Sequence, residues 1–188
     1  MKRVGATAPA ILAILGACGQ QHAPLPVYST IPEFSLTAQT GKPFQSSTEL
    51  KGRVWIANFI FTTCSGPCPR MTSQMSQVQK GLAGLEGVKL VSFTVDPARD
   101  TPEALAAYAA RFGAQRDRWF FLTGAPETLD HLSRKAFLLG SVDGRLDHST
   151  RFVLVDQQGR VRKYYDTTEA GAVRDAVADA ARLARAAS

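Results

Sequence analysis

The sequence predicts an α/β protein in which helices flank a central mixed β-sheet. Residues 54–61 are mostly β-branched or aromatic, and such a run is typical of a strand that is buried on both faces. Apolar residues then recur every three or four positions from Met71 to Leu85, which indicates an amphipathic helix. Residues 88–95 supply a second strand. Strand, helix and strand form a βαβ unit, so we expect two parallel strands joined by a right-handed crossover.

The residues before this unit predict an N-terminal β-hairpin. Apolar and polar side chains alternate over residues 32–44 around Thr40 and Gly41, which favours a hairpin at the edge or end of the sheet. Residues 47–50 are expected to form one helical turn. Lys51 and Gly52 then turn the chain into the central strand.

The residues after the unit predict two more helices and a strand. Thr101 is a good N-cap, Pro102 suits the first helical position, and Gly113 ends the helix. Residues 119–122 form a short aromatic strand, whose rings we assign to the core. Pro126 opens another helix.

The C-terminal part predicts a second hairpin and a closing helix. Residues 149–155 and 160–165 are strand-like segments joined by a turn at 156–159, and we expect them at the far side of the sheet. Residues 168–186 have one apolar face, as in a helix that packs on the sheet.

Two cysteines lie where the central strand ends and the next helix begins. Cys64 and Cys68 flank a Ser-Gly-Pro turn, and Pro69 suits the first helical position. Open α/β sheets place their sites at this carboxyl edge. The spacing lets both sulfur atoms meet in a disulfide or on one metal ion, and a helix N-terminus should lower a thiol pKa. A purely structural disulfide would gain little from closing so short a loop, although redox pairs more often read C-x-x-C.

His148 is the candidate third group. It precedes the apolar residues 152–155. Two thiolates and one imidazole form a soft set with few ligands that suits copper, whereas zinc usually takes a fourth ligand. A histidine at the start of a strand is, on its own, more often a hydrogen-bonded or exposed loop residue than a ligand. The alternatives are weaker, because His22 lies in an expected tether and His131 in a helical pattern.

Asp96 follows the second strand and should reach the same edge as Cys64. There its carboxylate would influence thiol ionisation or orient a ligand histidine. The alternative is that Asp96 and Pro97 only begin a turn.

Three segments resemble the signature blocks of the Sco/SenC family. They are Phe-Thr-Thr-Cys-Ser-Gly-Pro-Cys-Pro at 61–69, Val-Ser-Phe-Thr-Val-Asp-Pro-Ala-Arg-Asp-Thr-Pro at 91–102, and Asp-His-Ser at 147–149. The resemblance covers about residues 30–185 and implies a thioredoxin-like fold. It also implies that Cys64, Cys68 and His148 bind copper and that Asp96, the aspartate of the second block, lies close to them. The Ser-Gly-Pro tripeptide differs from the Pro-Asp-x often found between the cysteines, which bears on partner contacts and redox tuning.

The resemblance implies a copper chaperone for the dinuclear CuA centre of cytochrome c oxidase. Thiolates favour Cu(I) and imidazole also accepts Cu(II), so one site would carry both states. The acceptor would be subunit II of the oxidase or another copper or thiol protein, and a thioredoxin-like reductant would keep the cysteines reduced. The alternative is a thiol-disulfide oxidoreductase in which Cys64 and Cys68 are catalytic and no metal is stored. A peroxidase is a weaker third hypothesis.

The N-terminus predicts export and lipidation. A basic start, a short apolar run and small residues precede Cys18, as in a bacterial lipoprotein signal. We therefore expect a signal peptide at 1–17, lipidation of Cys18, a tether at 18–29 and a thioredoxin-like domain at 30–188. The protein would lie in the bacterial cell envelope, facing the periplasm or the outer surface. Lipidation of Cys18 leaves one pair of cysteines with no odd thiol.

The charge excludes one class of partner. The formal net charge is +6, and removal of Lys2 and Arg3 with the signal leaves +4. This excess is scattered along the sequence without a basic run or an aromatic stacking motif. We therefore expect no nucleic-acid binding, and relate the charge to solubility or to an acidic partner surface.

Overall fold

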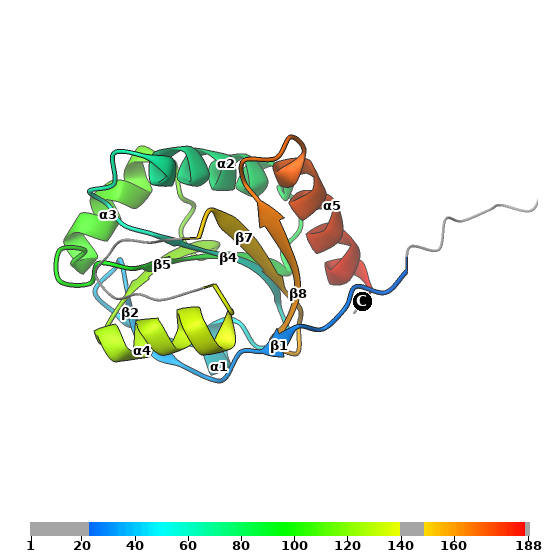
Figure 1. Cartoon of the computed structure of the whole chain (residues 1–188), viewed down its shortest axis with the longest axis horizontal. Coiled ribbons are helices and arrows are strands. Elements are labelled where there is room, and N and C mark those ends of the chain that lie inside the picture. The colour runs from blue at the N-terminus through cyan, green and yellow to red at the C-terminus, as the bar shows by residue number, and fades with distance from the viewer. Residues whose placement is uncertain (1–22, 140–148, 187–188) are drawn as a thin grey trace, which may run out of the picture.

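The computed structural model describes residues 23–139 and 149–186. Within these residues an eight-stranded sheet has the order β1-β8-β7-β4-β5-β6-β2-β3, and helices cover both of its faces (Figure 1). The strands are β1 (Ser29–Thr30), β2 (Ser35–Ala38), β3 (Pro43–Gln45), β4 (Val54–Ile60), β5 (Val88–Thr94), β6 (Trp119–Thr123), β7 (Arg151–Val155) and β8 (Arg160–Asp166). The helices are α1 (Ser46–Glu49), α2 (Pro67–Gly81), α3 (Pro102–Arg111), α4 (Pro126–His131) and α5 (Ala172–Arg185), and a π-helical turn, η1 (Leu132–Ala136), continues α4.

Strand β4 lies in the middle of the sheet, and all seven of its residues are buried. It pairs in parallel with β5 from Val54↔Val88 to Ile60↔Thr94, while β7 pairs with its other edge in antiparallel orientation. The predicted buried strand and parallel βαβ unit are confirmed. Because β4 and β5 end in register, the cysteine turn and the segment that begins at Asp96 leave the same edge of the sheet.

Both predicted hairpins are present. Strands β2 and β3 pair around a turn in which Gly41 has a φ of 75°, and β3 is an edge strand. The β7–β8 hairpin lies on the other side of β4 from β5 and turns through Gly159, with a φ of 73°. Parallel and antiparallel pairs thus share one sheet, so the predicted mixed α/β class is confirmed.

Two helical layers enclose the sheet. Helices α2, α3 and α5 cover one face, and α4 with η1 covers the other (Figure 1). On the α4 side, Phe137 lies edge-on to the rings of Trp55, Phe59 and Phe93, with centroids 5.4 to 5.7 Å apart. These rings belong to the hydrophobic core, and the aromatic strand β6 is buried as expected, with Phe120 partly exposed.

Two helix boundaries differ from the sequence prediction. Helix α2 begins at Pro67 rather than at Pro69, because Gly66 is its N-cap and Pro67 already takes the first position. Cys68 therefore lies inside the helix. Helix α5 begins at Ala172, after a turn in which the Asp166 carboxylate accepts hydrogen bonds from the amide and hydroxyl of Thr168.

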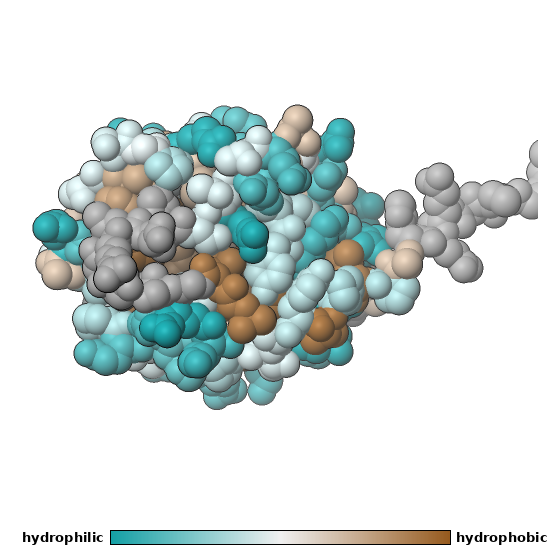
Figure 2. Space-filling model, in the orientation of Figure 1, coloured by the Kyte–Doolittle hydropathy of each residue, from teal (hydrophilic) through white to brown (hydrophobic). Residues whose placement is uncertain are grey.

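The described surface is mostly polar. Figure 2 shows a largely hydrophilic face with small brown patches between teal regions, and the exposed large apolar residues among those described are Val27, Tyr28 and Leu138. In the same part of the chain, no helix combines the length and apolar character needed to cross a bilayer.

Candidate functional site

The turn after β4 holds the two cysteines at different depths. Cys64 is partly exposed and its amide donates to the Phe61 carbonyl at 3.3 Å. Cys68 lies in the first turn of α2 and is fully buried. Both are free thiols, and the Cys68 thiol lies within hydrogen-bonding reach of the Cys64 side chain and the Phe61 backbone. The structure thus brings the two predicted sulfur ligands together.

Burial controls the ionisation of Cys68. It raises the pKa of the Cys68 thiol to about 12, against a lowering hydrogen bond from the Phe61 backbone. The Cys64 side chain and the negative charge of Asp100 raise the pKa further. The helix N-terminus was expected to lower this pKa, and that expectation is wrong for Cys68, because loss of water around the buried sulfur raises it. Cys68 is therefore a protonated thiol at neutral pH.

A second set of hydrogen bonds backs the site on the α3 side. The Thr72 hydroxyl donates to the Cys68 carbonyl at 2.8 Å and lies 3.1 Å from the Tyr108 hydroxyl. Since the Thr72 proton is used on the carbonyl, Tyr108 is the donor of the second bond. Burial raises the pKa of Tyr108 to about 12, so its hydroxyl stays protonated and uncharged near the two thiols.

Asp100 is a site residue that the sequence interpretation missed. Its fully buried carboxylate accepts hydrogen bonds from the Thr62 amide at 3.2 Å and from the hydroxyls of Thr62 and Thr94 at 2.5 Å. It therefore joins the end of β5 to the chain two residues before Cys64. In the sequence Asp100 lies in the second Sco/SenC-like block, directly before the N-cap Thr101, a position where acidic residues are usually solvated.

Of the other predicted site residues, the structure describes Asp96 but not His148 or Cys18. Asp96 begins the segment after β5, and its carboxylate forms an ion pair with Arg99 at 2.7 Å. Its placement beside the thiols stays a prediction, whereas the negative charge of Asp100 raises the pKa of Cys68. His148 and Cys18 lie outside the described residues. Within residues 23–139 and 149–186, no three His, Cys, Asp or Glu side chains form a group that would hold a metal ion.

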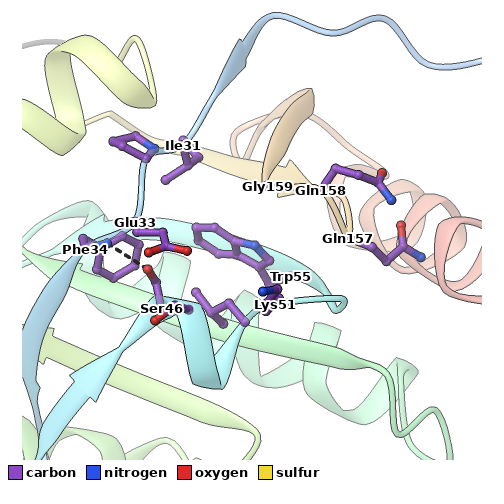
Figure 3. Close-up of a pocket in the computed structure, with 12 residues that line it drawn as sticks. Ile31, Glu33, Phe34, Ser46, Lys51, Trp55, Gln157, Gln158 and Gly159 are labelled. Atoms are coloured by element: carbon purple, nitrogen blue, oxygen red, sulfur yellow. Dashed lines mark hydrogen bonds between the residues drawn. The ribbon is translucent and has the colours of Figure 1, made fainter.

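A cavity lies at the end of the sheet opposite the cysteines. It has a volume of about 260 Å³ and is lined by Trp55 of β4, Lys51 before it, and Gln157 of the β7–β8 turn, among others (Figure 3). Because Trp55 is near the start of β4 and Cys64 follows its end, this cavity is not part of the cysteine site.

The comparison with protein families decides the relationship. The SCO1/SenC family model matches residues 23–185. The chain belongs to the SCO1/SenC family. The SCO1 protein homolog of Bacillus subtilis (strain 168) is 36% identical to this SCO1/SenC chain over 181 residues, which cover 93% of each protein. A putative copper-binding protein of Stutzerimonas stutzeri is 37% identical over 147 residues, or 73% of this chain and 70% of the relative.

Solved structures of the family share the fold. A SCO1/SenC family lipoprotein from Bacillus anthracis str. Ames has 37% identity and a TM-score of 0.75, over 83% of this chain and 95% of that one. BsSco, described with a disulfide switch and as a member of the Sco family of cytochrome c oxidase assembly proteins, has 33% identity and a TM-score of 0.77, over 88% and 99%. Copper-bound ScoI of Bradyrhizobium japonicum has 25% identity and a TM-score of 0.68, over 82% and 99%. The SCO1/SenC fold of this chain is thioredoxin-like, as expected.

Proposed function

We propose that this SCO1/SenC protein binds one copper ion as cargo between Cys64, Cys68 and His148 and passes it to an acceptor protein. The observation that carries the proposal is the pair of free thiols held within hydrogen-bonding reach of each other at the end of β4. Soft sulfur donors of this kind fit copper. Two relatives support the same cargo, namely the putative copper-binding protein of S. stutzeri and the copper-bound ScoI.

The chain next to His148 supports its role as the third ligand. The Thr150 carbonyl, two residues further on, accepts hydrogen bonds from the amide of Thr167 at 2.9 Å and from its hydroxyl at 2.6 Å. The Thr167 carbonyl in turn accepts from Gln74 at 2.9 Å and from Arg70 at 3.4 Å, both on α2. Thr150 is therefore linked through Thr167 to the helix that carries Cys68, and this link supports the proposal that His148, two residues before Thr150, is the third ligand.

Copper binding requires Cys68 to lose its proton. The pKa of Cys68 is raised to about 12 by burial, so the free protein holds a thiol at neutral pH, whereas the metal binds the thiolate. Copper uptake should therefore release a proton from Cys68 and tighten as the pH rises. Arrival of protons at the site favours release of the metal, which suits a protein that must give up its cargo.

The proposed acceptor is the CuA site of cytochrome c oxidase subunit II or another copper or thiol protein. BsSco is described as a member of a family of cytochrome c oxidase assembly proteins, which supports this direction of transfer. The B. anthracis family lipoprotein supports lipidation of Cys18 and attachment to the bacterial cell envelope. We place the domain on the periplasmic or outer side of the membrane, where a thioredoxin-like reductant would keep both thiols reduced.

The test is an anaerobic titration of the reduced protein with Cu(I). Each of Cys64→Ser, Cys68→Ser and His148→Ala should weaken copper binding by roughly 100-fold or more, because even partners outside the ligand set are worth 10–100-fold. His131→Ala is the matched control, since His131 is an exposed histidine of α4. Equal affinity and stoichiometry in the three ligand variants and the control would refute the copper proposal.

A second candidate function is thiol-disulfide exchange, favoured by the different exposure of the two cysteines. In that reaction the Cys64 thiolate attacks an acceptor disulfide and forms a mixed disulfide, and Cys68 then displaces the reduced acceptor and leaves a Cys64–Cys68 disulfide. Partial exposure suits Cys64 to the first step and burial suits Cys68 to the second. The described disulfide switch of BsSco is consistent with such a pair.

The Cys68→Ser variant distinguishes this second function. It should trap a mixed disulfide through Cys64, while Cys64→Ser should trap none, and His148→Ala should retain full exchange activity. Trapping through Cys68 alone, or loss of exchange in His148→Ala, would contradict the assignment.

A further inference from the structure

The end of the sheet opposite the cysteines gathers basic side chains. This basic edge consists of residues from the loops before β4 and β6 and from the last turns of α2 and α3. Its members are Lys51, Arg53, Lys80, Arg111, Arg116 and Arg118. Among the described residues none of these six forms an ion pair. The acidic residues on these and the adjoining segments are Glu49 of α1, Glu86 before β5 and Asp117 before β6, so the six basic residues outnumber them two to one.

Contacts between these loops show that the charges share one surface. The Arg118 guanidinium donates to the carbonyls of Leu82 and Leu85, just beyond α2, at 2.8 and 2.7 Å. The pKa of Lys89, at the start of β5, is lowered by burial and next by the positive charge of Arg53, while Glu49 and Asp117 raise it and Arg118 lowers it by a smaller amount. The cations that are scattered along the sequence therefore lie close enough to repel one another.

The cysteine edge has the opposite charge balance. The loop after β5, the end of β8 and the starts of α3 and α5 carry six acidic residues, namely Asp96, Asp100, Glu103, Asp166, Glu169 and Asp175. The basic residues of these segments and of the starts of α2 and β7 number four, namely Arg70, Arg99, Arg151 and Arg174. Among the residues counted, positive charge is thus in excess at the basic edge and negative charge is in excess at the cysteine edge.

The N-terminal segment is fixed at the basic end. Arg162 donates to the carbonyls of Leu25 and Pro26, and its Nη1 also binds Asp156 Oδ2 at 2.8 Å. Asp156 begins the β7–β8 turn, and the next residue, Gln157, accepts from the amide of Gly52 beside Lys51. In Figure 1 the blue segment leaves the domain at the right, on the side where β4 and α5 have their amino and carboxyl ends, respectively.

We propose that the basic edge lies on the anionic phospholipid surface of the membrane, so that the cysteine edge faces away from it toward the acceptor. This inference rests on the lipid anchor at Cys18 in the proposed function. Leu25 follows Cys18 by seven positions, and an extended chain spans at most about 3.6 Å per position, or roughly 25 Å. The anchor therefore keeps the end at which Leu25 is held next to the bilayer, where each Lys or Arg is attracted by anionic headgroups.

The short reach also selects lipid over other acidic partners. An acidic protein or a nucleic acid would have to enter the space between the basic edge and the bilayer to which the chain is tied. The membrane itself already occupies that place. Charge attraction and the tether then act in the same direction, and the dithiol is presented at the far end of the molecule.

The test follows energy transfer from tryptophan to a dansyl-labelled lipid headgroup, using the lipidated full chain in vesicles. Both tryptophans report on the basic edge, because Trp55 is the second residue of β4 and Trp119 the first of β6. Transfer should be strong in vesicles that contain phosphatidylglycerol. It should fall in pure phosphatidylcholine vesicles and in 1 M salt, where the screening length is about 3 Å.

Two double variants separate the basic edge from total charge. Lys51→Gln with Arg116→Gln should reduce transfer in phosphatidylglycerol vesicles to the level seen in neutral ones. Arg151→Gln with Arg174→Gln removes the same charge from the cysteine edge and should leave transfer unchanged. Equal transfer in neutral and anionic vesicles, or equal losses in the two double variants, would overturn the inference.

Flotation separates this inference from the proposed function. A chain that floats with neutral vesicles has its lipid anchor, whatever its orientation. A chain that does not float with neutral vesicles has no working lipid anchor. If that chain still floats with phosphatidylglycerol vesicles, binding by the basic edge is supported. If it floats with neither kind of vesicle, the inference is overturned. Copper binding does not enter the readout, so failure of the ligand variants would leave the result standing.

Discussion

Asp100 holds the residues that lead into Cys64. Its buried carboxylate receives hydrogen bonds from the amide and hydroxyl of Thr62 and from the hydroxyl of Thr94. Hydrogen bonds to a buried charged group are among the stronger ones in proteins. The same negative charge raises the pKa of Cys68, although less than burial does. One side chain thus fixes the position of the turn and adjusts the proton affinity of a proposed ligand.

We predict that loss of this carboxylate loosens the cysteine turn. In Asp100→Asn, an NH₂ group replaces one acceptor oxygen, and the free energy of unfolding should fall by about 1–3 kcal/mol. Asp100→Ala should lower it further, because the Thr62 amide and two hydroxyls lose their partner. Urea unfolding of the reduced protein measures the change, and hydrogen exchange of the Thr62 amide locates it.

The matched control is Asp96→Asn, at the other aspartate of the same sequence block. Its ion pair with Arg99 has one partner with a side chain that is 67% exposed, and such pairs contribute little. We therefore expect a much smaller change in unfolding free energy and unaltered exchange of Thr62. Equal effects of the two substitutions would show that burial of Asp100 has no special role in the turn.

Cys64 and Cys68 could be identified from the sequence because two thiols on a strand-to-helix turn point directly to redox or metal chemistry. Asp100 was missed because nothing in a sequence distinguishes an aspartate that caps a buried turn from one that is solvated before a helix. The error about the Cys68 pKa has the same origin. The effect of a helix N-terminus can be inferred from neighbouring residues, whereas burial of a sulfur depends on segments that pack from far along the chain.

At the scale of elements, the predictions that succeeded depended on local patterns. The unbroken apolar run of β4 predicted a strand with two covered faces, and all its residues are buried. Thr101 and Pro102 predicted the start of α3, and the Thr101 hydroxyl accepts from the Ala104 amide at 3.3 Å. The start of α2 was misplaced because Pro67 and Pro69 are both acceptable in a first helical turn, so the sequence alone did not decide between them.

Contacts between distant elements could not be predicted from such local patterns. A Cβ at Gly81, in the last turn of α2, would lie 2.9 Å from a methyl carbon of Val177 on α5. Glycine is needed here for the close approach of two helices that are nearly a hundred residues apart in the chain. The sequence shows a glycine near a helix end, which usually indicates only a C-cap. The packing of α2 against α5, within the helical layer that covers one face of the sheet, therefore could not be predicted from the sequence.

At the scale of the whole molecule, charge that looks scattered in the sequence is separated in space. The sequence suggested solubility or an acidic partner for the net charge, since no run of basic residues stands out. The parallel strands bring their preceding loops to one end and their following loops to the other, and this topology sorts the charges. Arg162 and the pairing of β1 with β8 both hold the N-terminal segment against the domain.

We predict that Arg162→Ala frees this segment from the domain. The Arg162 guanidinium donates hydrogen bonds to the carbonyls of Leu25 and Pro26. The nearby Tyr28 amide, which donates to Val161, reports on this segment. Its exchange rate should rise by roughly tenfold or more in Arg162→Ala, as expected for the loss of about 1.5 kcal/mol of local stability. Limited proteolysis around Leu25 provides an independent measurement. The fold of the sheet should persist.

The control is Arg160→Ala, because Arg160 binds the same Asp156 carboxylate at 2.8 Å without contacting Leu25 or Pro26. Burial alone would raise the pKa of Asp156, but hydrogen bonds from the Arg160 backbone and from both guanidinium groups lower it below its usual value. The stabilisation by this carboxylate is therefore present at neutral pH and is lost as the pH falls through the depressed folded pKa. Both variants should reduce that acid dependence, but only Arg162→Ala should expose Tyr28. Equal exchange of Tyr28 in the two variants would show that the segment is held by its strand pairing with β8 and not by Arg162.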